Sequence, residues 1–328
     1  VGSPAHKSFS EPAVFKTRPE NIEDFTFLYM SDSQDGDAEY GSLWKMAFEH
    51  AKAHHSEAAF LLHGGDIIQN SGDENLWKSM LEDVREYAMS LPIMPASGNH
   101  DYWRGGYLLG RLHLINDHFN ISLCEQNTEN GIYYSFDYGH CHFTVLNSGD
   151  FIETNGGLKK TQLEWLENDL KATEKKWKIV MIHNPIHSPG KYGSQDGWWT
   201  VPKKALKPQL TPIFGKYHVD LCLCGHDHVY SKTYPVTEYD QPCTGYHYET
   251  TVIDGISSKF AGCCGAQNRE PIDYIKGQHL RYLEEFEAME DNATAYSSVS
   301  ISRDTLCVHY YMLDKNGTIT QKVWGIIK

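Results

Sequence analysis

The chain contains no long apolar run and no cluster of basic residues in its 328 positions. Its apolar segments are all well short of the roughly 20 residues that a membrane-spanning helix needs, so we expect no membrane span. Acidic residues outnumber basic ones by 43 to 29, and the formal net charge is -14. Because duplex binding depends on basic groups that neutralise phosphates, this balance argues against a nucleic-acid duplex as partner. A small phosphate-containing substrate stays open, since bound metal ions can supply local positive charge.

Two further absences are a signal segment and a zinc-finger cysteine spacing. Residue 1 is Val and no basic-then-apolar segment follows, so we expect a processed or trimmed chain. The even number of cysteines, eight, permits disulfides, and three N-x-S/T sequons begin at Asn120, Asn292 and Asn316. We therefore expect a secreted or extracytoplasmic glycoprotein with disulfides. The alternating pair Cys222 and Cys224 has a second explanation, as small buried residues of a strand.

Hydrophobic periodicity predicts strands and helices that alternate along most of the chain. We interpret polar residues 1–23 as an N-terminal leader segment and residues 24–328 as a single domain, because no repeat or linker divides them. Helices are predicted at 39–55, 73–90, 106–119 and 160–176. Strands are predicted at 24–30, 58–70, 91–96, 131–148 (two strands joined at 138–139), 177–185, 219–228, 295–302, 305–313 and 318–326. This order predicts α/β layers, with antiparallel strands completing a sheet.

Side chains of the metal-ligand type follow or close five of the predicted strands, of which the one at 58–70 runs into a glycine turn. They are Asp32 with Gln34, Asp66, Asn99 with His100, His183, and His226 with His228. Taken singly, each has an ordinary structural explanation, such as a helix cap, a core imidazole or a turn. Loops at the carboxyl ends of strands converge on one edge of an α/β sheet. Five such strand ends in succession therefore predict a shared site.

The same ordered motifs resemble those of a known superfamily. The set 32-DSQ-34, 65-GD-66, 98-GNHD-101, 183-HNPIH-187 and 225-GHDH-228 is similar to the pattern of the calcineurin-like metallophosphoesterases. The flanking segments 161–170 and 218–236 most resemble those of purple-acid-phosphatase-like proteins. The resemblance runs from about residue 24 to the last residue. It implies a four-layer α/β/β/α sandwich with mixed sheets.

The resemblance also implies two divalent or trivalent metal ions (Fe, Mn or Zn) that share Asp66 as a bridge. Asp32, Asp66 and His228 would hold the first ion, and Gln34 either joins them or has a structural role. Asp66, Asn99, His183 and His226 would hold the second ion. Carboxylates and imidazoles suit these metals. Two ions about 3.5–4 Å apart can clamp a phosphate and hold a bridging hydroxide for in-line attack.

Four residues around these ligands have expected roles toward the substrate. His100 would protonate the leaving oxygen or stabilise its charge. Asp101 would orient the His100 imidazole or, alternatively, cap the next helix. Asn99 and His187 would contact the substrate, and the alternative for His187 is an ordinary loop histidine.

Two positions depart from the usual pattern. Gln34 stands where the commonest motif has His, and a neutral carboxamide is a weaker donor than an imidazole. Gln69 stands where purple acid phosphatases carry the Tyr whose bond to iron gives the colour. We therefore predict a colourless protein, even with iron bound.

The resemblance implies a metal-dependent hydrolase of phosphoric esters, with a small phosphate ester, foremost a phosphomonoester, as substrate. Alternatives are a phosphodiesterase for cyclic nucleotides or small diesters, a nuclease, and a non-catalytic binding protein on the same fold. The acidic balance weighs against the nuclease, and only Gln34 supports the non-catalytic protein. The sequence gives no indication of the oligomeric state.

Overall fold

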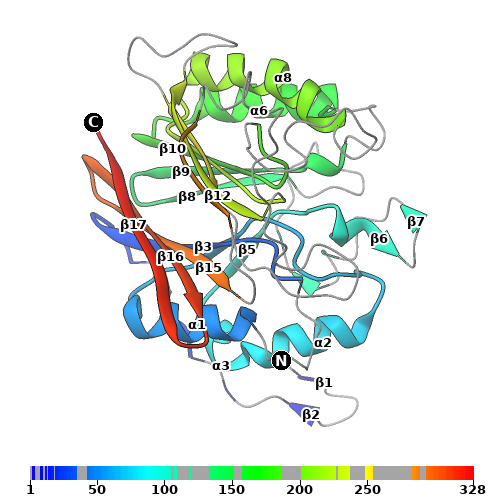
Figure 1. Ribbon diagram of the computed structural model, residues 1–328. Helices are drawn as coiled ribbons and strands as arrows, with labels where there is room; N and C mark the ends of the chain where they lie inside the picture. Colours follow the sequence, from blue (N-terminus) through cyan, green and yellow to red (C-terminus); the bar gives the residue numbers. More distant parts are fainter. Residues whose placement is uncertain are drawn as a thin grey trace.

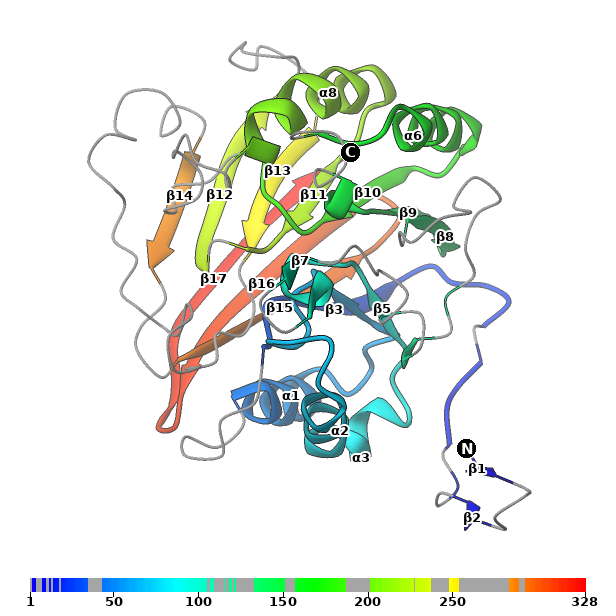
Figure 2. The same cartoon turned by 90° about the vertical axis from the view of Figure 1, so that its right-hand side faces the viewer.

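A computed structural model shows two mixed β-sheets packed face to face, with helices on both outer faces (Figures 1 and 2). It describes residues 2–3, 8–9, 12, 14–17, 19–34, 43–104, 107–108, 115, 118–119, 121, 133–150, 157–186, 201–226, 228–236, 248–253, 283–288 and 293–328. The predicted four-layer α/β/β/α sandwich is confirmed.

The larger sheet has seven strands in the order β14-β12-β13-β11-β10-β9-β8. Its strands are β8 (Tyr134–Tyr138), β9 (Cys141–Leu146), β10 (Trp177–Ile182), β11 (Leu221–Cys224), β12 (Val229–Val236), β13 (Tyr248–Ile253) and β14 (Leu283–Ala288). The four central strands β9, β10, β11 and β13 run parallel, and β8, β12 and β14 pair antiparallel at the edges.

The smaller sheet has six strands in the order β17-β16-β15-β3-β4-β5. Its strands are β3 (Phe25–Met30), β4 (Leu61–His63), β5 (Ile93–Pro95), β15 (Thr294–Ile301), β16 (Thr305–Asp314) and β17 (Gly317–Ile327). Strands β3, β4 and β5 run parallel, and β15, β16 and β17 form the antiparallel half. The last strands of the chain thus complete a sheet that its first strands begin.

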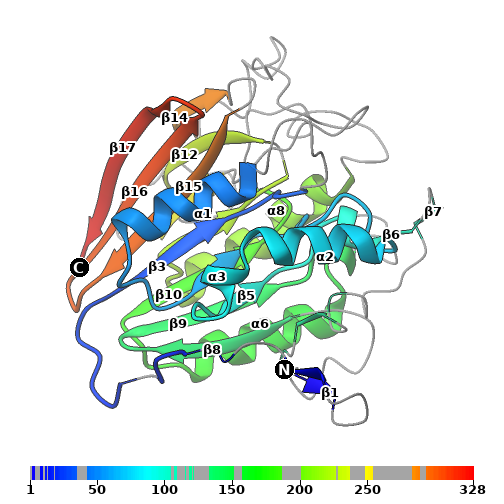
Figure 3. The ribbon, with the colours of Figure 1, turned by 90° about the horizontal axis from the view of Figure 1, so that it is seen from below.

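Helices cover the outer faces of both sheets (Figures 2 and 3). The larger sheet carries α6 (Lys160–Ala172) and α8 (Val201–Tyr217), and the smaller one carries α1 (Leu43–His54), α2 (Glu74–Asp83) and α3 (Arg85–Ala88). Short elements complete the described part: β1 (Gly2–Ser3), β2 (Ser8–Phe9), β6 (Trp103–Arg104), β7 (Tyr107–Leu108) and the 3-10 turns His100–Tyr102 and Ser148–Asp150. No helix in the described residues is both long and apolar enough to cross a membrane.

Strand β10 shows how the alternating side chains build two cores. Ile179 and Met181 point into the core between the sheets, whereas Val180 and Ile182 belong to the core under α6 and α8. Successive side chains of a strand face opposite sides, so a strand buried on both faces is apolar throughout. Phe27 of β3 and Phe143 of β9 meet edge to face across the sheets, with ring centroids 5.3 Å apart. This packing holds the two sheets in a fixed relation.

Several predicted elements differ from the observed ones. The predicted helix at 73–90 is two helices, α2 and α3, which meet at Val84. The predicted helix at 106–119 is wrong at Tyr107–Leu108, which form strand β7, and most of its other residues lie outside the described part. Helix α8 was not predicted, because Pro208 and Pro212 lie inside it. The three C-terminal strands are confirmed.

Candidate metal centre

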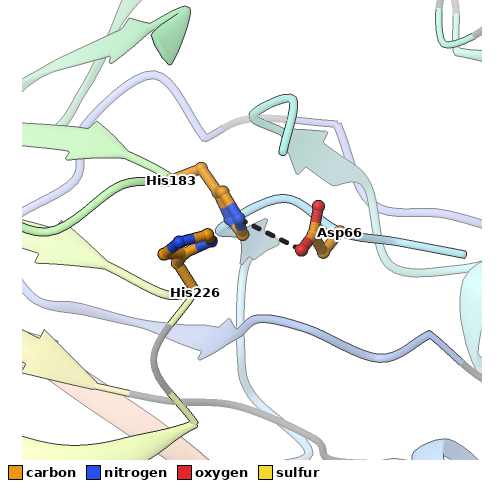
Figure 4. Close-up of side chains that lie close together, drawn as sticks. All are labelled: Asp66, His183 and His226. Atoms are coloured by element: carbon orange, nitrogen blue, oxygen red, sulfur yellow. Dashed lines mark ion pairs between the residues drawn. The ribbon is translucent and has the colours of Figure 1, made fainter. Parts of the chain in front are cut away.

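The predicted ligands come together in the loops that follow β3, β4, β5, β10 and β11. Their side chains are buried, with at most 8% of any side chain exposed for Asp32, Gln34, Asp66, His183, His226 and His228; Asn99 is half-buried. Donor atoms of Asp66, His183 and His226 all lie within 4.8 Å of one another (Figure 4). Chain segments from both sheets thus deliver oxygen and nitrogen donors to one point.

Asp66 lies at the middle of this cluster. Its Oδ2 is 3.2 Å from His183 Nε2 and accepts a hydrogen bond from Gln34 Nε2 at 3.1 Å. Its Oδ1 accepts from the backbone N–H of His100 at 2.7 Å. The carboxylate therefore contacts groups from the loops after β3, β5 and β10.

The imidazole of His183 is oriented for ligation through Nε2. Its Nδ1 lies 2.9 Å from the carbonyl oxygen of Gly64, which can only accept, so Nδ1 carries a proton. Nε2 then faces Asp66 and lies 3.3 Å from Asn99 Oδ1. A backbone carbonyl that fixes the tautomer in this way is the usual partner of a metal-binding imidazole.

Asp32 forms the second half of the cluster. Its carboxylate accepts from Ser31 Oγ at 2.5 Å and from the backbone N–H of His226 at 2.9 and 3.1 Å. His228 Nε2 lies 3.3 Å from Asp32 Oδ1. Asp32 and His228, which the sequence assigns to one ion, are therefore adjacent.

The backbone at the site is unusual in two respects. Five of the predicted ligands have positive φ angles: Asp32 (55°), Gln34 (32°), Asp66 (50°), His226 (78°) and His228 (53°). Such angles are uncommon outside glycine, and their clustering is typical of functional sites. Two glycines also allow close approach, since a Cβ at Gly98 would overlap the Asp66 carboxylate and one at Gly225 would overlap Ser31 and Asp32.

The charges of the cluster favour a cation. Burial by itself would lower the pKa of His183, but the carboxylates of Asp66 and Asp32 raise it to about 10. Burial would raise the pKa of Asp32, yet His183 and His228 hold it well below its usual range, and His183 with His100 does the same for Asp66. The site therefore binds positive charge strongly, and a metal ion would compete with the proton on His183.

Asp101 is fully buried and binds backbone amides. Its oxygens accept from the N–H groups of Asp66 (2.8 Å), Ile67 (3.0 Å) and Gly98 (2.7 Å). Burial and the charge of Asp66 raise the pKa of Asp101 to about 8, although these amides act in the opposite direction. Asp101 thus joins the loop of Asp66 to the loop of Asn99, which neither predicted role described.

His100 is oriented by a backbone carbonyl instead. Its Nδ1 lies 3.1 Å from the carbonyl oxygen of Gln69, so Nδ1 donates and Nε2 is left for another partner. The predicted substrate contact of His187 lies outside the described residues.

The sequence did not predict the roles of His63 and Ser33, which hydrogen-bond to each other and to the loop that carries Asp66. His63 is buried, and burial lowers its pKa to about 4, so it is neutral. Its Nε2 lies 2.9 Å from Ser33 Oγ, which donates to the Ile67 carbonyl, and its Nδ1 accepts from the Gly65 N–H. A possible signal was that Ser31 and Ser33 alternate with Asp32 and Gln34 directly after a strand.

The residues present fit a transition-metal centre. Carboxylate and imidazole donors dominate, and the Gly64 carbonyl fixes the proton of His183 on Nδ1. Among the described cysteines, Cys222 and Cys224 of β11 lie on the face of the strand that packs under the helices. The buried Asp and His cluster is therefore consistent with a metal site.

Comparison with known proteins finds relatives among the phosphoesterases, in agreement with the buried Asp and His cluster. A model of the calcineurin-like phosphoesterase family matches residues 25–230. Acid phosphatase type 7 of Mus musculus is 25% identical over 287 residues, which cover 81% of this chain and 60% of the mouse protein. Probable inactive purple acid phosphatase 24 of Arabidopsis thaliana is 26% identical over 275 residues, covering 74% of this chain and 43% of the plant protein.

Among solved structures, a purple acid phosphatase from yellow lupin (Lupinus luteus) seeds matches with a TM-score of 0.71 and 18% identity. The match covers 95% of this chain and 56% of the lupin chain. At this identity the likeness supports the fold alone. The chain spans 60% or less of the length of each of these three relatives.

Proposed function

The chain belongs to the calcineurin-like phosphoesterase family, and from this we propose that it is a dinuclear-metal-dependent hydrolase that acts on phosphomonoesters. The observation that carries the proposal is the contact of Asp66 with groups from three loops, beside His183 and His226. The similarity to acid phosphatases supports the monoester as substrate. Relatives described as probably inactive make catalysis the point to test.

Each ligand has a defined place in the proposed centre. Asp66 would bridge the ions, Asp32 and His228 would hold one of them, and Asn99, His183 and His226 would hold the other. When bound, the ions would polarise the phosphoryl group and supply a nucleophile from water. The protein positions part of this set in advance, because Asp101 joins the loops of Asp66 and Asn99, and Asp32, Asp66, His226 and His228 already hold their positive φ angles.

His100 is proposed as the general acid. Its Nδ1–H is held by the Gln69 carbonyl, so a proton on Nε2 is the one available for the leaving oxygen. His100 also donates its backbone N–H to Asp66, which fixes the distance between acid and metal centre. The proposed substrate contacts of Asn99 and His187 complete this arrangement.

The proposal is tested by hydrolysis of p-nitrophenyl phosphate and bis-p-nitrophenyl phosphate. Metal-free protein is reconstituted with Mn, Fe or Zn, and the Asp66→Asn variant serves as comparison. We expect the monoester to be cleaved faster and the variant to lose at least about a hundredfold in rate, as expected for the loss of a ligand that orients the metals. Faster cleavage of the diester would favour the phosphodiesterase, and fully metal-loaded protein without activity would favour a binding protein.

Secretion is a separate proposal. It is supported by the three sequons, of which Asn316 is exposed in the turn between β16 and β17. The four cysteines in the described part, Cys141, Cys222, Cys224 and Cys307, are free thiols and give it no support; the other four lie outside that part. A mass shift after enzymatic deglycosylation of protein from its native source would support secretion, and an unglycosylated chain would count against it.

A further inference from the structure

Gln34 lies beside Asp66 with its amide nitrogen, not its oxygen, toward the carboxylate. Nε2 donates to Asp66 Oδ2 at 3.1 Å, and the Gln34 side chain is 1% exposed. The backbone N–H of Gln34 also donates to the Asp66 carbonyl at 3.2 Å. An amide N–H has no lone pair for a metal ion, so in this orientation Gln34 is a hydrogen-bond donor to the bridging ligand.

The two halves of the proposed metal centre therefore differ in the side chains that can coordinate an ion. One half has Asp66, Asn99, His183 and His226, with the donor atoms of three of them already within 4.8 Å of one another and Asn99 Oδ1 3.3 Å from His183 Nε2. The other half has Asp32 and His228, with Asp66 shared. Among the described residues, this half has fewer donors than the first half, and it has one imidazole where the first half has two.

The Asp32 carboxylate is also hydrogen-bonded by other groups of the protein. Its carboxylate already accepts from Ser31 Oγ and from the His226 N–H, and His228 lies beside it. Hydrogen bonds to the charged form draw electron density from a carboxylate, so it donates less to an ion. In the other half, the Gly64 carbonyl that accepts from His183 Nδ1 makes the His183 imidazole a better donor.

We propose that the two metal positions are unequal because position 34 supplies no ligand to the second one: Gln34 donates a hydrogen bond to Asp66 and does not offer a lone pair to an ion. The position of Asp66, Asn99, His183 and His226 binds its divalent ion first and tightly, and the position of Asp32 and His228 binds a second ion weakly. The inference rests on the proposed metal centre and adds a regulatory property to it. Because catalysis needs both ions, the rate would depend on the concentration of free metal, with the second position as the sensor.

The test is calorimetric titration of chelator-treated protein with MnCl₂, with bound metal counted by elemental analysis after gel filtration. We expect one retained ion per chain and a second binding event that is weaker by about 10- to 100-fold, the scale of a lost or redirected ligand contact. Gln34→His should strengthen the second event toward the first, because an imidazole replaces an amide. Gln34→Ala should leave the second event within about threefold of the wild type, because no ligand is removed.

Controls separate this inference from the proposed function. Gln321→His makes the same substitution at an exposed position of β17 and should leave both events unchanged. Thermal unfolding checks that each variant is folded. Two equal binding events, or a loss of tenfold or more in Gln34→Ala, would overturn the inference while leaving the metal centre intact. Protein that binds no ion would overturn both.

Discussion

At the scale of single residues, Asp66 is held in place by contacts to both of its carboxylate oxygens and to its backbone N–H. It contacts Gln34 and His183 through one oxygen and the His100 backbone through the other. Its own N–H is bound by Asp101. A carboxylate held on both sides by protein groups is preorganised, so little reorganisation remains when ions bind.

Gly98 controls the space next to this carboxylate. A Cβ at position 98 would overlap Asp66 and its backbone N, so Gly98→Ala must displace the bridging ligand. We expect the tight metal affinity to fall by about 10- to 100-fold, with a cost in stability of about 1–3 kcal/mol. Calorimetric titration with MnCl₂ and urea unfolding measure the two effects.

Gly317→Ala is the matched control for this substitution. Its φ of +124° makes alanine unfavourable, but Gly317 lies in a turn with open space around it. The control should lose stability and keep its metal affinity. Unchanged affinity in Gly98→Ala would show that Asp66 can move freely and is not held as described.

The clustering of Asp66, His183 and His226 could be predicted from sequence because each of them follows a strand and belongs to a short motif. Their supporting partners could not, since Asp101 binds backbone amides from residues 66, 67 and 98, which only the folded chain brings together. The contact between His63 and Ser33 could not be predicted either, because the two residues are 30 positions apart and meet only in the folded chain. Whether Gln34 coordinates is likewise a question of amide orientation, about which the residue type says nothing.

At the scale of elements, α1 and the antiparallel half of the smaller sheet share a cluster of histidines and tyrosines. His50 Nδ1 lies 2.8 Å from Tyr296 Oη, the His50 and His54 rings stack at 4.0 Å, and the His55 and Tyr311 rings lie 5.6 Å apart. The contact joins the end of α1 to β15 and β16. Charging these imidazoles would place positive charges against one another.

The cluster should make the protein less stable in mild acid. Burial and then His54 and His55 lower the pKa of His50, and burial, His309 and His54 lower that of His55, with Glu57 acting in the opposite direction. Since the folded pKa values lie below 6.5, the unfolded chain binds protons more readily. The contribution of neutral His50 and His55 to stability is therefore complete above about pH 6.5 and is lost as the pH falls below this value.

Urea unfolding of metal-free protein at about pH 7.5 and about pH 5.5 checks this prediction. The midpoint of the wild type should fall more between these values than that of a His50→Gln/His55→Gln variant. His140→Gln, in the turn between β8 and β9, should keep the wild-type difference. If the urea midpoints of the wild type and the double variant fall equally between the two pH values, His50 and His55 do not cause the loss of stability in acid.

Helices and strands were predicted correctly where the hydrophobic pattern was unambiguous. Strand β10 is apolar on both faces and is bounded by charged and polar residues, so its pattern has one solution. Helix α8 carries two prolines, which count against a helix in any local pattern, yet its Leu206, Leu210 and Phe214 are fully buried under the larger sheet. Tertiary burial there outweighs the local cost of proline.

At the scale of the whole molecule, the site is where the two sheets are joined. Tyr29 of β3 donates its hydroxyl to the Cys224 carbonyl of β11 at 2.7 Å, and His183 from the larger sheet donates to Gly64 of the smaller one. Ligands from either sheet would be held together by the ions they share. The four-layer order was predictable because strands and helices alternate, whereas the pairing of β15 with β3 links residues too far apart for any local pattern.

The most direct test of the account is a crystal structure of the Mn²⁺-loaded protein with anomalous difference maps. The account predicts a strong peak bound by Asp66, Asn99, His183 and His226, and a weaker one on the other side of Asp66 toward Asp32 and His228. Peaks that do not touch Asp66, or the absence of any peak at saturating Mn²⁺, would contradict it.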